Sequence, residues 1–425
     1  MNYKHLFTLL ISLITTLTGQ AQSFQELFRD STLRIDYIFE GNETEQRIAV
    51  DNLNLMPGWY GKRNRLAELP VEGNGQIIIR DHRSQLIIYR NSFSTLFQEW
   101  LSFENTTHMR KAFENVFLIP MPKDTVDVTI TLFDNHRQET AKLTHMVLPD
   151  DILIRQIGFY HVTPYVTLQQ AENPNHCIHI AYIAEGYTKE QMDDFINDAR
   201  IANKALFAHE PFKSLKKRFN VIAVKSPSLE SGTSEPSNGI WRNTALGSHF
   251  DTFYSERYLT TLQLKKLHDW LAGTPYEHII VLVNTDHYGG GGILNSYNLS
   301  MTKHPLYRPV VVHEFGHSFA GLGDEYAYET EAIPMYPHDI EPWEKNLTTL
   351  VDFHGKWENL ISPKTKIPTP VGEDTRKVGL YEGAGYSMKG VYRALPDCRM
   401  RTNENPEFCF VCRKAITDLI NFYTE

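Results

Sequence analysis

The pattern His-Glu-x-x-His, at positions 313 to 317, restricts the possible fold of this chain more strongly than any other feature of its sequence. Side chains four residues apart lie on one face of an α-helix, so His313 and His317 can bind one cation if this segment is helical. Pro309 suits the first helical turn, and the valines that follow it indicate a buried helix. Glu314 lies beside the histidines, where it can accept a proton from a water molecule without being a ligand.

A catalytic zinc ion needs a third protein ligand and keeps one position open for water. The glycines of Gly321–Gly323 can end the helix and turn the chain sharply, because glycine tolerates positive φ. Asp324 follows directly and is the expected third ligand, with Glu325 as a partner that fixes a ligating imidazole. In an alternative arrangement, the third ligand is a carboxylate on a later helix, such as Glu329 or Glu331.

The region around this motif, residues 151–425, alternates apolar runs with helical periodicity. Three runs predict strands: Ile178–Ile183, Phe219–Val224 and His278–Asn284. Helical patterns cover about 189–207, where Thr188 can cap the helix, and 261–271. Strands alternating with helices are typical of a three-layer α/β domain with a largely parallel sheet. The glycine run Gly289–Gly292 is either a flexible loop or the approach to an edge strand over Ile293–Leu299.

Residues 22–150 lack long helical periodicity. Alternating runs separated by turn-rich breaks predict strands in this region: Leu33–Phe39, Gln76–Ile79, Leu86–Tyr89 and Val126–Leu132. This pattern favours an antiparallel β-sandwich. Its Asp and His residues show no ligand spacing, so we expect a supporting or substrate-orienting domain.

The first 21 residues have the pattern of a signal peptide. Lys4 gives a positive start, Leu6–Leu17 is mostly apolar, and Gly19–Ala21 supplies small residues for cleavage. A retained N-terminal anchor is the alternative. We expect an exported protein, periplasmic or extracellular, without stable membrane insertion, because no other stretch is long and apolar enough to span a bilayer. The net charge of −9 argues against nucleic-acid binding.

Three of the four cysteines, Cys398, Cys409 and Cys412, lie close together near the C-terminus. In an exported protein such a group can oxidise, so we expect a structural disulfide from Cys398 to Cys409 or Cys412. The Cys-x-x-Cys spacing alone does not define a structural zinc site, since that normally needs four ligands and the chain has no second pair.

The segment His313–Tyr326 resembles the IgA-peptidase-like family of zinc metallopeptidases, within the metzincin-type clan. Other segments share the resemblance: Val281–Asn284, Tyr288–Gly292, Glu230–Gly232, Tyr392–Arg393 and Cys398–Met400. The likeness covers about 160–425, and the upstream β domain of such families would correspond to 23–150. It implies a metzincin-like catalytic domain. One departure concerns the third histidine of the wider metzincin pattern, whose place Gly323 takes here, with Asp324 one residue later.

The resemblance further implies a zinc site formed by His313, His317 and Asp324, with Glu314 as general base. It also implies a methionine turn beneath the metal, for which Met400 is the natural match and Met388 a rival.

These observations predict a secreted zinc-dependent metalloendopeptidase that hydrolyses peptide bonds with a zinc-activated water. Tyr392 is the candidate donor to the oxyanion, because it lies shortly before Met400. The expected partner is a protein or peptide substrate, host proteins among the candidates, and the sequence encodes no cleavage preference. The alternative is an exported, metal-dependent binding or adhesion module without catalysis, although such a module would have no use for Glu314.

Overall fold

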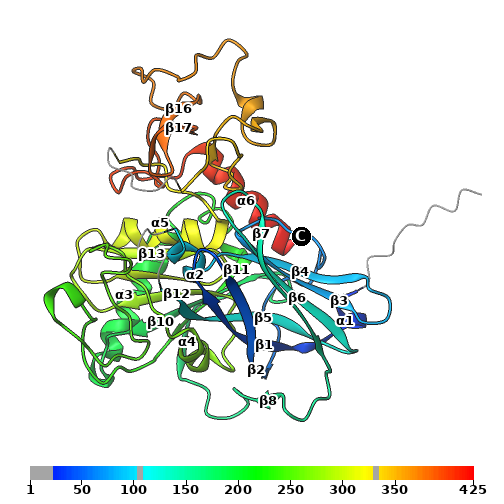
Figure 1. Cartoon of the computed structure of the whole chain (residues 1–425). Helices are drawn as coiled ribbons and strands as arrows, with labels where there is room; N and C mark the ends of the chain where they lie inside the picture. Colours follow the sequence, from blue (N-terminus) through cyan, green and yellow to red (C-terminus); the bar gives the residue numbers. More distant parts are fainter. Residues whose placement is uncertain (1–22, 103–108, 329–334) are drawn as a thin grey trace, which may run out of the picture.

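The computed structural model of the chain describes residues 23–102, 109–328 and 335–425 (Figure 1). The expected signal peptide, residues 1–21, and the alternative ligands Glu329 and Glu331 lie outside these ranges. Within them, no helix is both long and apolar enough to cross a membrane.

An N-terminal β domain consists of two four-stranded sheets, in the orders β5-β1-β2-β8 and β4-β3-β6-β7. Its strands are β1 (Phe28–Gly41), β2 (Gln46–Pro57), β3 (Gly75–Asp81), β4 (Ile87–Phe93), β5 (Lys111–Pro122), β6 (Val126–Phe133), β7 (Glu139–Val147) and β8 (Arg155–Gln156). Two short helices accompany them, α1 (Phe24–Leu27) and α2 (Leu96–Trp100). The sheets pack face to face, since Phe93 of β4 lies 4.3 Å from Phe117 of β5 between ring centroids.

The α/β domain is built on a six-stranded sheet in the order β13-β14-β12-β10-β11-β9. Its strands are β9 (Tyr165–Gln169), β10 (Ile178–Glu185), β11 (Phe219–Val224), β12 (His278–Val283), β13 (Gly290–Ile293) and β14 (Tyr297–Met301). The four inner strands are parallel and the two edge strands antiparallel, which agrees with the predicted largely parallel sheet. The expected edge strand over Ile293–Leu299 is wrong: the glycine run itself forms the edge, and Leu299 lies on the inner strand β14.

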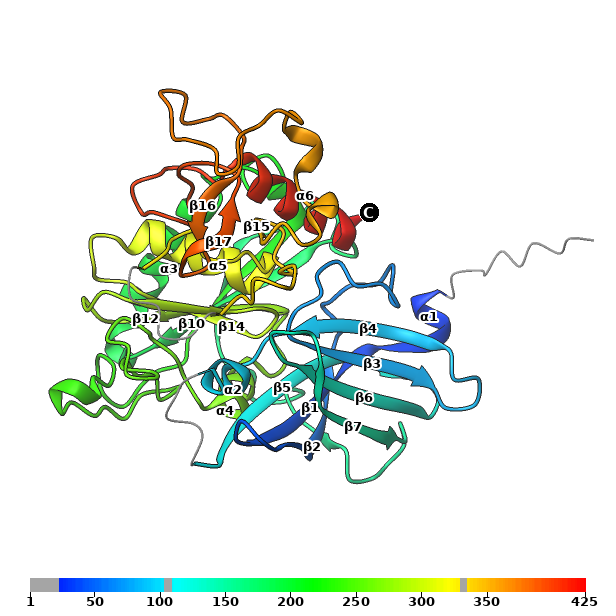
Figure 2. The same ribbon diagram turned by 45° about the horizontal axis from the view of Figure 1, so that its top comes forward.

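This sheet separates two hydrophobic cores, because successive side chains of a strand point to opposite faces. Ile180 and Tyr182 of β10 join a core with the helices α3 (Met192–Leu206), α5 (Tyr307–Ala320) and α6 (Phe410–Thr424). Ala181 and Ile183 face a core shared with α4 (Leu264–Leu271) and the N-terminal β domain. The N-terminal domain therefore packs on one face of the six-stranded sheet, and the two domains lie side by side in Figure 2.

The helix starts follow the sequence signals. Thr188 forms the expected cap, reciprocally bonded with Gln191, and a short 3-10 turn (Lys189–Gln191) leads into α3. A three-stranded antiparallel sheet of β15 (Leu347–Thr348), β16 (Tyr381–Ala384) and β17 (Ser387–Arg393) lies above α5 in Figure 2.

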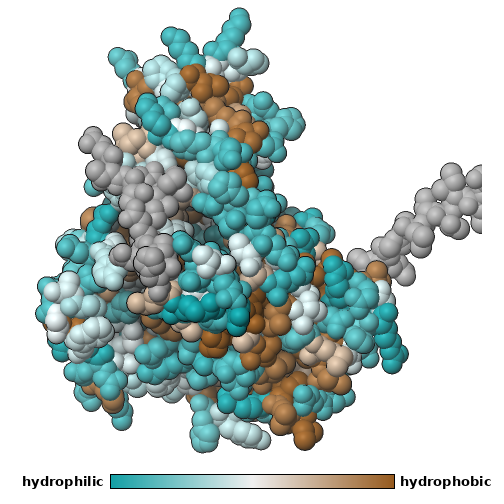
Figure 3. Space-filling model, viewed as in Figure 1, coloured by the Kyte–Doolittle hydropathy of each residue, from teal (hydrophilic) through white to brown (hydrophobic). Residues whose placement is uncertain are grey.

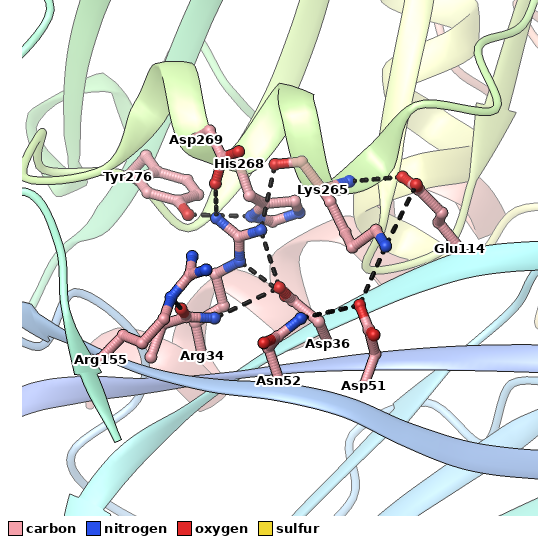
Figure 4. Close-up of polar contacts among 11 residues, drawn as sticks. Arg34, Asp36, Asp51, Asn52, Glu114, Arg155, Lys265, His268, Asp269 and Tyr276 are labelled. Atoms are coloured by element: carbon pink, nitrogen blue, oxygen red, sulfur yellow. Dashed lines mark hydrogen bonds and ion pairs between the residues drawn. The ribbon is translucent and has the colours of Figure 1, made fainter. Parts of the chain in front are cut away.

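A buried arginine joins the two domains (Figure 4). Arg34 of β1 is 1% exposed and donates to both carboxylate oxygens of Asp36, at 2.7 and 3.0 Å. The same guanidinium donates to Asp269 at 2.6 Å and to the carbonyl oxygen of Lys265, both on α4. Lys265 in turn binds Glu114 through its backbone amide. Helix α4 is thereby held against β1 and β5.

The face seen in Figure 3 is mostly hydrophilic, with apolar side chains gathered at its lower edge. The connection between β7 and β8 carries two largely exposed apolar side chains, Ile152 and Leu153.

Candidate metal centre

Helix α5 carries the His-Glu-x-x-His motif and places both imidazoles on one face, as predicted. The Nε2 atoms of His313 and His317 lie 3.0 Å apart. Gly321 ends the helix with φ +59°, and the returning chain brings Asp324 Oδ1 to 3.1 Å from His313 Nε2 and 3.2 Å from His317 Nε2. The structure thus brings together the three residues expected to ligate zinc.

Backbone carbonyls orient the two imidazoles. His313 Nδ1 lies 2.9 Å from the carbonyl oxygen of Arg399, and His317 Nδ1 lies 2.5 Å from that of Leu322. A carbonyl only accepts, so each Nδ1 carries the proton and each Nε2 directs a lone pair toward the cluster. The prediction that Glu325 fixes an imidazole is therefore wrong, because backbone carbonyl oxygens accept the Nδ1 hydrogen bonds of both histidines.

The buried carboxylate of Asp324 favours positive charge at this cluster, which a protonated imidazole or a bound cation can supply. Asp324 Oδ1 is buried and faces both imidazoles at 3.1 and 3.2 Å. Burial lowers the pKa of His317, but Asp324 outweighs this effect and raises that pKa to about 9. Burial would raise the pKa of Asp324, yet the two histidines hold it well below its usual range. Two imidazoles and a carboxylate in this arrangement fit a zinc ion with an open position.

Glu314 lies at the turn of α5 between the two histidines and faces the glycine-rich strand β13. Burial raises its pKa, the charge of Asp324 adds to the effect, and the two histidines oppose it. A Cβ atom on Gly290 would lie 2.6 Å from Glu314 Oε1, and one on Gly292 would lie 2.6 Å from the Glu314 carbonyl oxygen. The glycines are therefore needed so that β13 can approach α5 closely.

Met400 lies beneath the motif helix. It is fully buried, and a Cβ atom on Gly316 would lie 2.7 Å from its Sδ. Its carbonyl oxygen accepts a hydrogen bond from the backbone amide of Glu325 at 2.8 Å. The rival Met388 is half exposed on β17. The structure thus places Met400, and not Met388, where the methionine turn was expected.

Tyr386, which the sequence did not single out, contacts the cluster directly. Its hydroxyl donates to Asp324 Oδ2 at 2.5 Å from the turn between β16 and β17. The predicted oxyanion donor, Tyr392, lies six residues further along this hairpin. The charged groups that act on Tyr392 are Glu382 and Lys389, and none of the three clustered residues is among them. Tyr392 pairs with Glu382 across the hairpin, and its role as the oxyanion donor stays a prediction.

The N-terminal domain also reaches this region. Glu99 of α2 accepts a hydrogen bond from the Tyr258 hydroxyl, and burial raises its pKa to about 7. His317, Asp324 and Glu314 all act electrostatically on Glu99. The N-terminal domain was expected to carry no chemistry, but it places a titratable carboxyl near the metal centre.

The expected disulfide is not formed. All four cysteines, each within the described part of the chain, have free thiols, and Cys398 Sγ lies 3.8 Å from Cys412 Sγ.

Comparison with known families agrees with this site. A family model described as IgA Peptidase M64 matches residues 166–376 and 372–420, which include the whole cluster. A second model, described as Peptidase M64 N-terminus, matches residues 23–144, which lie in the β domain. The two matches therefore define the class of this protein as a peptidase. The chain belongs to the IgA Peptidase M64 family, a family of metallopeptidases. No curated protein matches the chain.

Proposed function

We propose that this protein is an exported, zinc-dependent metalloendopeptidase. One observation carries the proposal: His313 Nε2, His317 Nε2 and Asp324 Oδ1, three atoms of metal-ligating type, converge within 3.2 Å of one another. Membership of a metallopeptidase family supports it. Zinc is the metal proposed because the donors are two imidazoles and one carboxylate.

In the proposed mechanism, these three side chains would hold a zinc ion, which when bound would supply a Lewis acid for the scissile carbonyl and make the attacking water more acidic. Glu314 accepts a proton from that water and delivers it to the leaving nitrogen as the C–N bond breaks. Its raised pKa supports both steps, because the carboxyl is then closer to the working pH. Tyr386 acts as a positioning residue: its hydrogen bond to Oδ2 directs the other oxygen of Asp324 into the cluster.

The test is hydrolysis of a peptide library by the full chain, with and without a zinc chelator. We expect chelation to abolish turnover and added zinc to restore it. Glu314→Gln should lower turnover by at least about 100-fold, the usual contribution of general acid-base catalysis, while the zinc content stays that of the parent protein. Equal turnover by Glu314→Gln and the parent would instead support the non-catalytic binding module.

The third ligand is tested separately. Asp324→Ala should lose chelator-sensitive turnover, whereas Glu329→Ala and Glu331→Ala should keep it. The opposite pattern would assign the third ligand to one of the later glutamates.

Export is the remaining part of the proposal and rests on the pattern of residues 1–21. Sequencing the N-terminus of the protein recovered outside the cytoplasm should show a chain that begins near Gln22. Recovery of the chain with Lys4 still present would support a retained anchor.

A further inference from the structure

A second group of metal-binding side chains lies on the far side of the methionine turn. Its members are Glu325, Cys398, Cys409 and Cys412, whose ligand atoms all lie within 4.8 Å of one another. Each residue is buried, and Glu325, Cys398 and Cys412 have no exposed surface. The group joins three parts of the chain: the bend after α5, the methionine turn and the start of α6.

The spacing within this group matches metal coordination. Two thiolates bound to one tetrahedral zinc ion, each about 2.3 Å from it, lie about 3.8 Å apart. Cys398 Sγ and Cys412 Sγ are separated by 3.8 Å, and Cys412 Sγ lies 3.1 Å from Glu325 Oε1. Three sulfurs and one carboxylate oxygen complete a four-ligand set, which is the number that a structural zinc ion requires.

Glu325 gives an independent indication of a missing partner. Its Oε1 accepts hydrogen bonds from Asn346 and Cys412, whereas its Oε2 is buried without a partner among the described residues. A buried carboxyl oxygen without a partner is costly, and it commonly indicates an ion or water at the site.

Burial raises the pKa of Glu325, Cys398 and Cys412, whereas nearby hydrogen-bond donors and arginines favour negative charge at this group. The backbone amide of Cys409 donates to Cys398 Sγ at 3.1 Å, and that of Cys412 donates to Cys409 Sγ at 3.4 Å. Cys409 also caps the N-terminus of α6, where partial positive charge favours an anion. Three thiolates, one carboxylate and Zn²⁺ would leave two negative charges, and two buried arginines act on the group, Arg393 on Glu325 and Arg399 on Cys398.

We propose that Cys398, Cys409, Cys412 and Glu325 hold a second, structural zinc ion. This ion ties α6 to the methionine turn, whose Arg399 carbonyl orients His313. It also fixes Glu325, which directly follows the catalytic-site ligand Asp324 in the chain. The two zinc sites would thus be adjacent in the chain at positions 324 and 325 but different in chemistry, one with an open position and the other closed by four protein ligands.

The decisive sample is the full chain carrying His313→Ala and His317→Ala, which removes the catalytic ligands and leaves the cysteine group intact. We expect it to retain one zinc ion per chain, with sulfur scatterers at about 2.3 Å in X-ray absorption spectra, the usual Zn–S distance. After exchange of zinc for Co²⁺, the same variant should show thiolate-to-cobalt charge-transfer absorption, which a site of nitrogen and oxygen ligands lacks. Cys409→Ser should lose this absorption.

Three outcomes for the doubly substituted chain would overturn the proposal. The chain could contain no metal, or its bound metal could have no sulfur neighbours. Its mass could also be lower by two hydrogens, which would reveal a disulfide between two of the cysteines. Because this variant is read by metal content and spectra, failure here is distinguishable from failure of the proposed peptidase activity.

Discussion

Replacing Tyr386 by Phe removes one hydroxyl from the hairpin turn and leaves the remainder of the side chain in place. That hydroxyl donates to Asp324 Oδ2 at 2.5 Å, in a partly buried setting. A hydrogen bond to a charged group contributes about 1.5–3 kcal/mol. At about 1.4 kcal/mol per factor of ten, its loss should weaken zinc binding at the catalytic site by roughly 10- to 150-fold. Other partners of metal ligands have effects of similar size.

The assay is reconstitution of peptide hydrolysis in metal-free protein at buffered zinc concentrations, compared between the variant and a control so that any contribution of the second zinc ion is common to both. The matched control is Tyr392→Phe, which removes a hydroxyl from the same hairpin at a position paired with Glu382. We expect the half-saturating zinc concentration to rise for Tyr386→Phe and to stay unchanged for Tyr392→Phe. Equal zinc dependence of Tyr386→Phe and the parent, or a loss confined to Tyr392→Phe, would refute this reasoning.

Three further predictions concern stability. Gly292→Ala should lower the unfolding free energy by about 1–3 kcal/mol and also lower kcat/KM, because the new Cβ would force β13 away from α5. The control is Gly355→Ala, whose Cβ would have no neighbour within 4 Å, and it should change neither quantity. Arg34→Met should cost about 3–5 kcal/mol in denaturant unfolding, since it leaves a buried carboxylate unpaired, whereas Arg29→Ala, from an exposed pair, should cost at most about 1 kcal/mol. Burial lowers the pKa of His179 to about 4, so the unfolded chain binds more protons between pH 6.5 and 4. The free energy of unfolding should therefore decrease as the pH is lowered from 6.5 to 4, by up to about 1.4 kcal/mol per pH unit. His179→Gln should make this decrease smaller.

Local sequence signals predicted the elements that depend on local physics. The strand over Phe219–Val224 and the helix cap at Thr188 were found, because apolar runs and capping residues act within a few positions of the chain. The pairing of His313 with His317 follows from helical geometry alone, and Asp324 follows from a bend only a few residues away.

Contacts between distant segments had no such signal. Tyr386 reaches Asp324 from 62 residues away, and its position depends on how the β16–β17 hairpin packs above α5. Glu99 belongs to another domain, and only the packing of that domain on the catalytic sheet brings it near Glu314. The glycines of β13 resembled a flexible loop, because their actual constraint is the close approach of α5, which no local pattern encodes.

The cysteines show a related limit. Spacing alone favoured a disulfide, since only three cysteines are close together in the sequence. The fold adds Glu325, which lies 73 positions before Cys398 in the chain, and so supplies the fourth candidate ligand.

The most direct test of the central claim is anomalous X-ray diffraction at the zinc edge from crystals of the zinc-loaded protein. The account predicts a peak about 2.0–2.2 Å from His313 Nε2, His317 Nε2 and Asp324 Oδ1, the usual distances for zinc bound to nitrogen and oxygen. Crystals grown with excess zinc that show no peak among these three atoms would contradict it.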